Sequence, residues 1–164
     1  MKLSTIRPSI FMLCASVAVA AAAAGSVRAA TPTAERAIRP IMARMLQAAN
    51  AHDTSRFMAP YLHAPSLVFV FDGMLITGWK PLYAQQLKWW NHGKSDWQYS
   101  NGGPREFMKL APGVELTTWR VNARRVLPGG KVTASALVVS YVWKRLPRGW
   151  RIVYGHESWA NPPS

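Results

Sequence analysis

The chain has 164 residues, of which 20 are lysine or arginine and 7 are aspartate or glutamate, so its formal net charge is +13. It contains eight tryptophans but one cysteine, Cys14, which excludes a disulfide framework and any site built from several thiolates. The length suits one domain with a hydrophobic core of its own.

The first segment, residues 1–29, is predicted to be a secretory signal peptide. Positive charges precede an alanine-rich apolar run over 10–24, and Val27-Arg28-Ala29 resembles a cleavage site. Because the apolar run is short for a membrane span, we expect an exported protein, periplasmic or extracellular, with residues 30–164 forming a single domain. The mature chain would then carry a net charge of +10, from 17 basic and 7 acidic residues.

Export decides how this basic charge is interpreted. In a cytoplasmic protein it would indicate nucleic-acid binding, but an exported chain rarely meets nucleic acid, so we expect no nucleic-acid partner. The basic residues are scattered along the mature chain, where Arg124-Arg125 and Lys144-Arg145 are the only adjacent pairs. They indicate either a solvated basic surface or weak attraction to anionic surfaces.

Two helices are predicted at the start of the mature chain. Over 38–51 apolar residues recur every three or four positions, which is typical of an amphipathic helix. Pro40 lacks a backbone donor and disfavours helix before it, so we expect a kink or a new start there. Asp53 is placed to cap a short second helix over 55–62.

The pattern then changes to that of β-strands. The β-rich runs 67–71 and 74–77 flank Asp72-Gly73, which is the preferred two-residue hairpin turn because both positions need positive φ. A third helix is predicted over 78–93. Four long strands with Pro- and Gly-containing turns follow, over 97–110, 114–126, 131–145 and 150–159. This order predicts the α+β class, with one strongly curved antiparallel sheet and about three helices on one face.

The element order and the last strand, Trp-Arg-Ile-Val-Tyr-Gly-His-Glu-Ser, resemble the nuclear transport factor 2-like superfamily, most of all its SnoaL-like and ketosteroid-isomerase-like branch. Segments 48–61, 66–79 and 149–159 carry the likeness, which extends over essentially all of the mature domain. The resemblance implies a cone-shaped, cystatin-like α+β roll around a deep apolar pocket, and a homodimer formed through the outer sheet face. The fold hosts enzymes, binding proteins and assembly domains, so it does not by itself assign a function.

The last strand carries the main candidate for a functional residue. Under strict alternation of faces, one face holds Trp150, Ile152, Tyr154 and His156. An aromatic and apolar face should turn inward, and Glu157 is then predicted to face outward. His156 is therefore expected to reach the pocket as a general base or hydrogen-bond donor, because imidazole titrates near neutral pH. The alternative is a core histidine held by a neighbouring hydroxyl group.

Other chemistry is largely excluded. The four histidines are far apart in sequence and none has a second ligand at helical or strand spacing, so we expect no metal and no cofactor. Strand 67–71 lacks the aspartate base that ketosteroid isomerases require, and strand 131–143 lacks the pocket acid of SnoaL-like cyclases. No nucleophile elbow and no phosphate-binding glycine loop occurs.

The aromatic residues suggest what the pocket binds. A small cone cannot bury eight tryptophans without placing some at the pocket, so we expect a small apolar or aromatic molecule as the ligand. The residues predicted to line the pocket are Tyr83, Trp90, Tyr99, Tyr141, Tyr154 and His156. Two alternatives remain: an isomerase, cyclase or dehydratase with His156 as its general base, and a domain that binds a partner through its outer sheet face.

Overall fold

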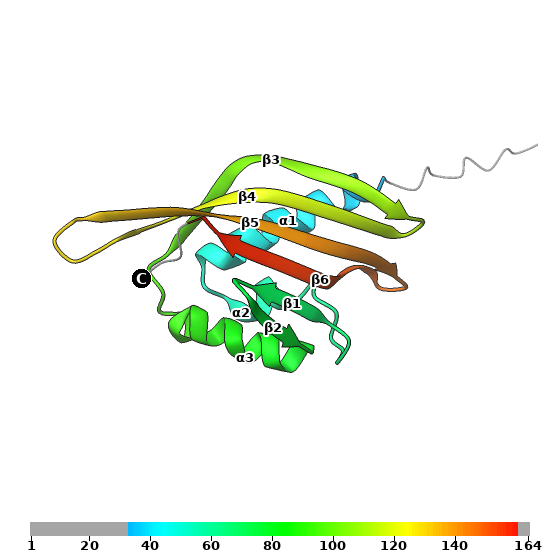
Figure 1. Ribbon diagram of the computed structural model, residues 1–164, viewed down its shortest axis with the longest axis horizontal. Helices are drawn as coiled ribbons and strands as arrows, with labels where there is room; N and C mark the ends of the chain where they lie inside the picture. The colour runs from blue at the N-terminus through cyan, green and yellow to red at the C-terminus, as the bar shows by residue number, and fades with distance from the viewer. Residues whose placement is uncertain (1–32, 161–164) are drawn as a thin grey trace, which may run out of the picture. The chain divides into compact units, whose positions relative to one another are not determined.

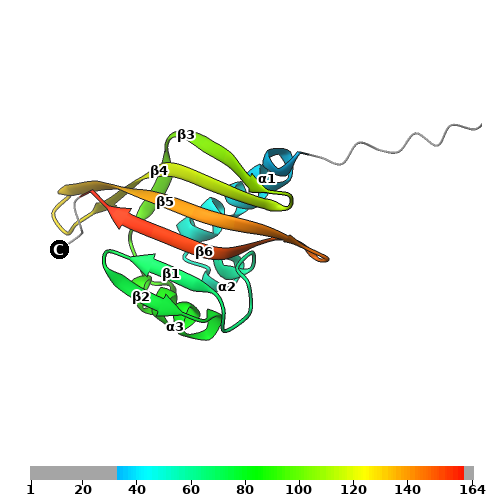
Figure 2. The ribbon, with the colours of Figure 1, turned by 45° about the vertical axis from the view of Figure 1, so that its right-hand side comes forward.

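The computed structural model describes residues 33–160, so the predicted signal peptide lies outside the described residues. The elements in chain order are α1 (Ala34–Asn50), α2 (Thr54–Met58), β1 (Val68–Phe71), β2 (Met74–Thr77), α3 (Trp79–Trp89), a 3-10 turn η1 (Asn91–Gly93), β3 (Gln98–Ala111), β4 (Val114–Val126), β5 (Val132–Leu146) and β6 (Gly149–Trp159). The strands form one sheet in the order β2-β1-β6-β5-β4-β3, and the helices lie on one side of it (Figures 1 and 2). The predicted α+β class is confirmed.

The sheet is mixed, where the sequence predicted a wholly antiparallel one. Strands β1 and β6 pair in parallel, and the other four pairings are antiparallel. The segment before β1 already runs along β6 in this direction. There the Leu62 amide donates to the Ile152 carbonyl at 2.8 Å, and the Ile152 amide donates to the Pro60 carbonyl at 3.0 Å. The β1–β2 hairpin therefore joins the sheet beside the last strand.

Helix α1 continues through Pro40, so the predicted new start at this residue is wrong. Pro40 is exposed, and the opposite side of the helix buries Ile38 and Met42. The donor that proline lacks is lost on the solvent side, while burial of the other side stabilises the helix. The predicted cap of α2 is confirmed, since Asp53 Oδ1 accepts from the Arg56 amide at 3.0 Å. Within residues 33–160, no helix has the length and apolar character needed to cross a membrane.

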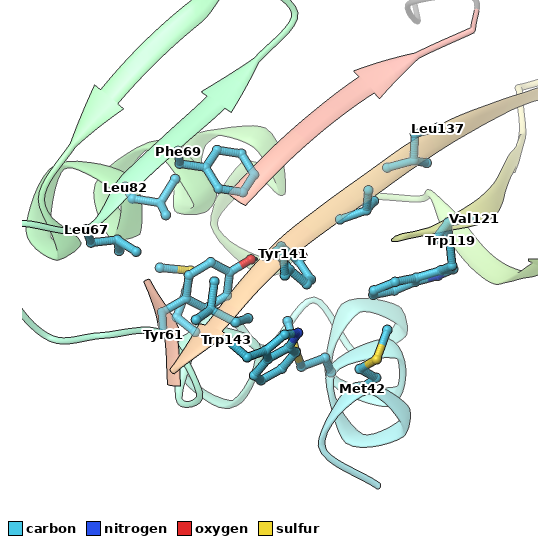
Figure 3. Packing of buried hydrophobic residues seen from close by; sticks show 14 of the residues in the cluster. Met42, Tyr61, Leu67, Phe69, Leu82, Trp119, Val121, Leu137, Tyr141 and Trp143 are labelled. Atoms are coloured by element: carbon cyan, nitrogen blue, oxygen red, sulfur yellow. Dashed lines mark hydrogen bonds between the residues drawn. The ribbon is translucent and has the colours of Figure 1, made fainter. Parts of the chain in front are cut away.

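The hydrophobic core lies between α1 and the inner face of the sheet. Figure 3 shows Tyr61 beside Tyr141, and Trp143 near the helix that carries Met42. The Tyr61 hydroxyl donates to the Tyr141 hydroxyl at 3.0 Å, and Trp143 Nε1 donates to the Thr117 hydroxyl at 2.9 Å. These buried polar atoms are therefore paired, as a stable core requires.

Strand β6 contains a bulge that determines which residues face the core. On β5, Val142 pairs with Tyr154, whereas the next residue, Trp143, pairs with Ile152. Val153 is therefore an extra residue that has no partner of its own on β5. An unpaired residue of this kind shifts the alternation of faces by one position in the rest of the strand.

Candidate functional site: an aromatic cavity under the sheet

A cavity of about 150 Å³ lies between the helices and the inner face of the sheet. Apolar cavities of about this size accept a benzene-sized guest. Nine of its seventeen lining residues carry aromatic rings. The lining residues are Met45, Leu46, Ala49, Phe57, Phe71, Gln86, Trp89, Trp90, Trp97, Tyr99, Trp119, Val121, Leu137, Val139, Tyr141, Glu157 and Trp159. Figure 3 shows four of them, Trp119, Val121, Leu137 and Tyr141, side by side on β4 and β5.

Several aromatic walls of the cavity meet at steep angles. Phe57 and Trp90 pack edge to face with ring centroids 4.9 Å apart, and Trp97 and Trp159 do so at 5.7 Å. Edge-to-face packing adds attraction beyond the burial of surface and holds each ring against its neighbour. The side chains that line the cavity come from α1, α2, the end of α3, the strands and residues that flank them.

Tyr99 is fixed at the cavity by contacts from two helices. Its backbone amide donates to Asn50 Oδ1 at 2.6 Å, and Asn50 Nδ2 donates to the Tyr99 carbonyl at 2.9 Å. Its hydroxyl accepts from Trp90 Nε1 at 3.3 Å. Burial raises the pKa of Tyr99 to about 12, so this hydroxyl keeps its proton at physiological pH.

Glu157 is the one acidic residue among those that line the cavity. After the bulge at Val153, Glu157 and Trp159 lie on the inner face of β6 and line the cavity. Burial, and then the charge of Asp72, raise the pKa of Glu157 to about 8. Hydrogen bonding by Trp159 lowers this pKa and so partly opposes the rise. Asp72 is held nearby because its Oδ1 accepts from the Trp159 amide at 3.0 Å. At neutral pH the Glu157 carboxyl is therefore mainly protonated.

The bulge also corrects the orientation predicted for two residues of the last strand. His156 is exposed, and neither His156 nor Tyr154 is among the residues that line the cavity. Both lie on the outer face of the sheet, because the extra residue, Val153, shifts the alternation that holds for Trp150 and Ile152. The inward placement of His156 and Tyr154 is therefore wrong, and the residue that reaches the cavity is Glu157.

The other predicted pocket residues divide in two groups. Trp90, Tyr99 and Tyr141 line the cavity. Tyr83 does not, because α3 turns it toward α2, where its hydroxyl lies 2.8 Å from the Ser55 hydroxyl and its ring stacks on Trp79 at 4.9 Å. The predicted lining position of Tyr83 is therefore wrong, and the part of this region that borders the cavity begins at Gln86.

The sequence reasoning missed Glu157, the acid of this site. One signal pointed to it: the face that holds Glu157 also holds Gly155 and Trp159, a small residue and a large aromatic one that suit an interior. The structure explains the glycine, because a Cβ at Gly155 would lie 2.5 Å from the ring of Phe69. On that face, the Phe69 ring of the neighbouring strand β1 therefore lies over Gly155.

The donor set of the cavity does not resemble a metal site. In the part of the chain that the structure describes, no three His, Cys, Asp or Glu side chains gather closely enough to hold an ion. The cavity instead offers one carboxyl group, two phenol hydroxyls and the amide of Gln86 within an aromatic wall. These groups can form hydrogen bonds with a small guest and can exchange a proton with it.

Comparison with known proteins supports the fold. The sequence matches no family model and no curated protein. Similar solved structures include an NTF-2 like protein of unknown function from Shewanella oneidensis (19% identity, TM-score 0.60, covering 74% of this chain and 95% of that one). Another is a ketosteroid isomerase-like protein from Erwinia carotovora (16%, 0.62, covering 80% and 100%).

A third similar structure is an NTF2-like protein with a cystatin-like fold from Novosphingobium aromaticivorans (16% identity, TM-score 0.62, covering 78% of this chain and 82% of that one). At these identities the likeness shows the fold alone. Residues 33–160 therefore have the cystatin-like α+β fold of nuclear transport factor 2-like proteins.

Proposed function

We propose that this protein binds one small, largely apolar molecule in the aromatic cavity. The observation that carries the proposal is a preformed hollow of about 150 Å³ within the fold, walled by nine aromatic side chains. Preformed apolar pockets with a few polar groups are the usual architecture of small-molecule sites. The few polar groups here are those of Gln86, Tyr99, Tyr141 and Glu157, together with the indole N–H groups of the lining tryptophans.

A titration of tryptophan fluorescence tests this function, because five tryptophans line the cavity. Single-ring probes such as phenol and toluene should change the emission and raise the unfolding temperature. A ligand at 100 times its Kd stabilises a folded protein by about 2.7 kcal/mol. If no probe changes the emission or the unfolding temperature, the proposed function is wrong.

Two neighbouring residues of β5 supply a matched pair of variants. Leu137 lines the cavity, whereas Val138 points to the outer face and is 48% exposed. Leu137→Phe places extra atoms in the hollow and should weaken probe binding at least tenfold. Val138→Phe adds a ring on the other side of the same strand and should leave binding unchanged.

An acid–base enzyme is the second candidate, and the Glu157 carboxyl favours it. An acid whose pKa lies near 8 can give or take a proton near neutral pH, and Tyr141 lines the same cavity. One similar structure is a ketosteroid isomerase-like protein. For this candidate, Glu157→Gln should abolish turnover of a bound ketone while the ketone still binds. With Glu157 in the cavity and His156 outside it, His156→Gln should leave turnover unchanged.

The site of action is part of the same proposal. The predicted signal peptide, residues 1–29, favours a role outside the cytoplasm. The mass of the protein recovered from the periplasm or the medium measures this directly. We expect a mature chain that starts at Ala30, whereas a full-length chain in the cytoplasm would contradict export.

A further inference from the structure

We propose that the ligand of the aromatic cavity is a small organic cation, a substituted ammonium ion whose charged head is enclosed by the aromatic rings and paired with Glu157. This rests on the proposed binding function and names the ligand class. The first argument is the character of the wall. Among the described residues that line the cavity, none is Lys, Arg or His, and Glu157 is the one carboxylic acid.

Aromatic rings attract cations through the negative electrostatic potential of their faces. Tryptophan is the strongest of them, and five of the nine lining rings are tryptophans. Two of these rings already have a guanidinium group over one face: the Arg125 guanidinium lies 5.0 Å from the centroid of Trp97, and that of Arg105 lies 5.7 Å from the centroid of Trp119. A bound cation would therefore contact the other rings, among them Trp89, Trp90 and Trp159. A substituted ammonium ion can make the same contact with several rings at once, which is how aromatic cages select such ions.

The setting of Glu157 supplies the second argument. Its carboxyl lies in a largely apolar cavity, and the charge that acts on it is that of Asp72, another acid. A neutral guest would leave this acid protonated, and an anionic guest would be repelled once Glu157 or Asp72 is charged. A cation bound beside Glu157 would stabilise the charged form of its carboxyl group, because opposite charges attract strongly where water is excluded.

Size and long-range charge are compatible with this ligand. A cavity of about 150 Å³ holds a benzene-sized guest, and a trimethylammonium head has a similar number of heavy atoms. The chain as a whole is basic, which disfavours cations at a distance. This effect is largely screened beyond about 8 Å at physiological salt, whereas the contacts inside the cavity are not.

The test compares two molecules of the same shape that differ in charge. Choline carries a quaternary ammonium group, and 3,3-dimethylbutan-1-ol carries a carbon atom in place of its nitrogen. Calorimetric titration of the purified protein should give an affinity for choline at least tenfold higher than for the alcohol. Equal or tighter binding of the alcohol would overturn the cation inference and leave the cavity as a site for neutral molecules.

Adjacent residues of β6 supply the variants for the same titration. Glu157→Gln keeps the shape of the side chain and removes its charge, so it should lower the affinity for choline about tenfold more than the affinity for the alcohol. His156→Gln changes the neighbouring residue on the outer face and should alter neither affinity. If Glu157→Gln lowers both affinities equally, Glu157 does not pair with a cation.

The affinity for choline should also depend on pH. Glu157 must release its proton to pair with a cation, so the affinity should rise with pH, by at most tenfold per pH unit, and level off above about pH 8. The groups that act near Glu157 are Asp72, Tyr61, Tyr99, Tyr141 and, across Trp97 and Trp159, Arg125.

Burial keeps the three tyrosines protonated through this pH range. The slope should therefore disappear in Glu157→Gln, and a slope that persists there would contradict the pairing. If neither choline, the alcohol nor any single-ring probe binds, the proposed function itself fails. That outcome differs from the preference for a neutral guest, which would overturn the charge of the ligand alone.

Discussion

The carboxyl group of Glu157 couples the stability of the fold to pH. Its pKa rises from 4.5 to about 8 on folding. Between these values the folded chain holds a proton that the unfolded chain has released, so stability falls as the pH rises through about 8. One such group contributes a slope of at most about 1.4 kcal/mol per pH unit. Denaturant unfolding at pH 5, 6.5 and 8 should show this fall, and Glu157→Gln should remove it.

The neighbouring residue provides the control for this measurement. His156→Gln alters an exposed side chain on the same strand and should retain the slope of the original protein between pH 5 and 8. If Glu157→Gln keeps the same slope as the original protein, the carboxyl is not buried in solution and its place in the cavity is wrong. Comparing the variants over the same range cancels the contribution of the other titratable groups.

The buried pair of Tyr61 and Tyr141 makes a different residue-scale prediction. Tyr141→Phe leaves the Tyr61 hydroxyl without its acceptor, which should cost about 1–3 kcal/mol of unfolding free energy. In the double Phe variant neither hydroxyl remains, so its loss should be smaller than the sum of the two single losses. Urea unfolding of the four proteins measures the coupling. Additive losses would show that the two hydroxyls do not interact.

At the scale of elements, neighbouring residues in the sequence predicted the turns, helix caps and strand bounds. The Asp72-Gly73 turn has positive φ at both positions, 42° and 86°, as its sequence indicates. The cap at Asp53 and the four long strands follow the sequence to within a few residues. The bulge at Val153 could not be predicted in this way, because it arises from pairing with residues of β5 and with the segment before β1. That one residue exchanged the faces of His156 and Glu157, so the fold was predictable while the acid of the site was not.

The close approach of β1 to β6 can be tested through its glycine. A methyl group at Gly155 would lie 2.5 Å from the Phe69 ring, so Gly155→Ala should lower stability by about 1–3 kcal/mol. Phe69→Leu in the same chain should recover part of the loss, because it removes the ring that the methyl group meets. Gly103→Ala is a matched control on β3, since nothing lies within 4 Å of the added atom. If Gly155→Ala and Gly103→Ala have the same unfolding temperature, the close packing of Gly155 against Phe69 is wrong.

At the scale of the whole molecule, the curved sheet explains why a hollow survives in a protein so rich in aromatic residues. The cavity lies between the inner residues of β4 and β5 and side chains from α1, α2 and the end of α3. The sequence could predict that aromatic side chains line the cavity, and Trp90, Tyr99 and Tyr141 do so. It could not predict the volume, which depends on how closely helices and sheet approach and not on any local pattern.

The outer face of the sheet leads to the last prediction, a homodimer. Cross-strand pairing places an apolar row across five strands of this face, made of Met108, Leu116, Val142, Tyr154 and Val68. Met108 is 59% exposed in the single chain. Apolar surface aligned across a sheet favours association, and a stable interface buries at least about 1,000 Å² in total. We expect light scattering of the purified protein to give twice the mass of one chain.

A charged residue in the middle of this row can test the homodimer without disturbing the fold. Val142→Glu should give a folded monomer, because an acid buried between two sheets would lack a partner. Ala134→Glu places the same charge on an exposed position further along β5 and should leave the dimer intact. If the original protein is monomeric at tens of micromolar, or if the Val142→Glu variant still dimerises, this face is not a dimer interface. Because the cavity is lined by residues of the inner face of the sheet, probe binding should be the same in the monomeric variant.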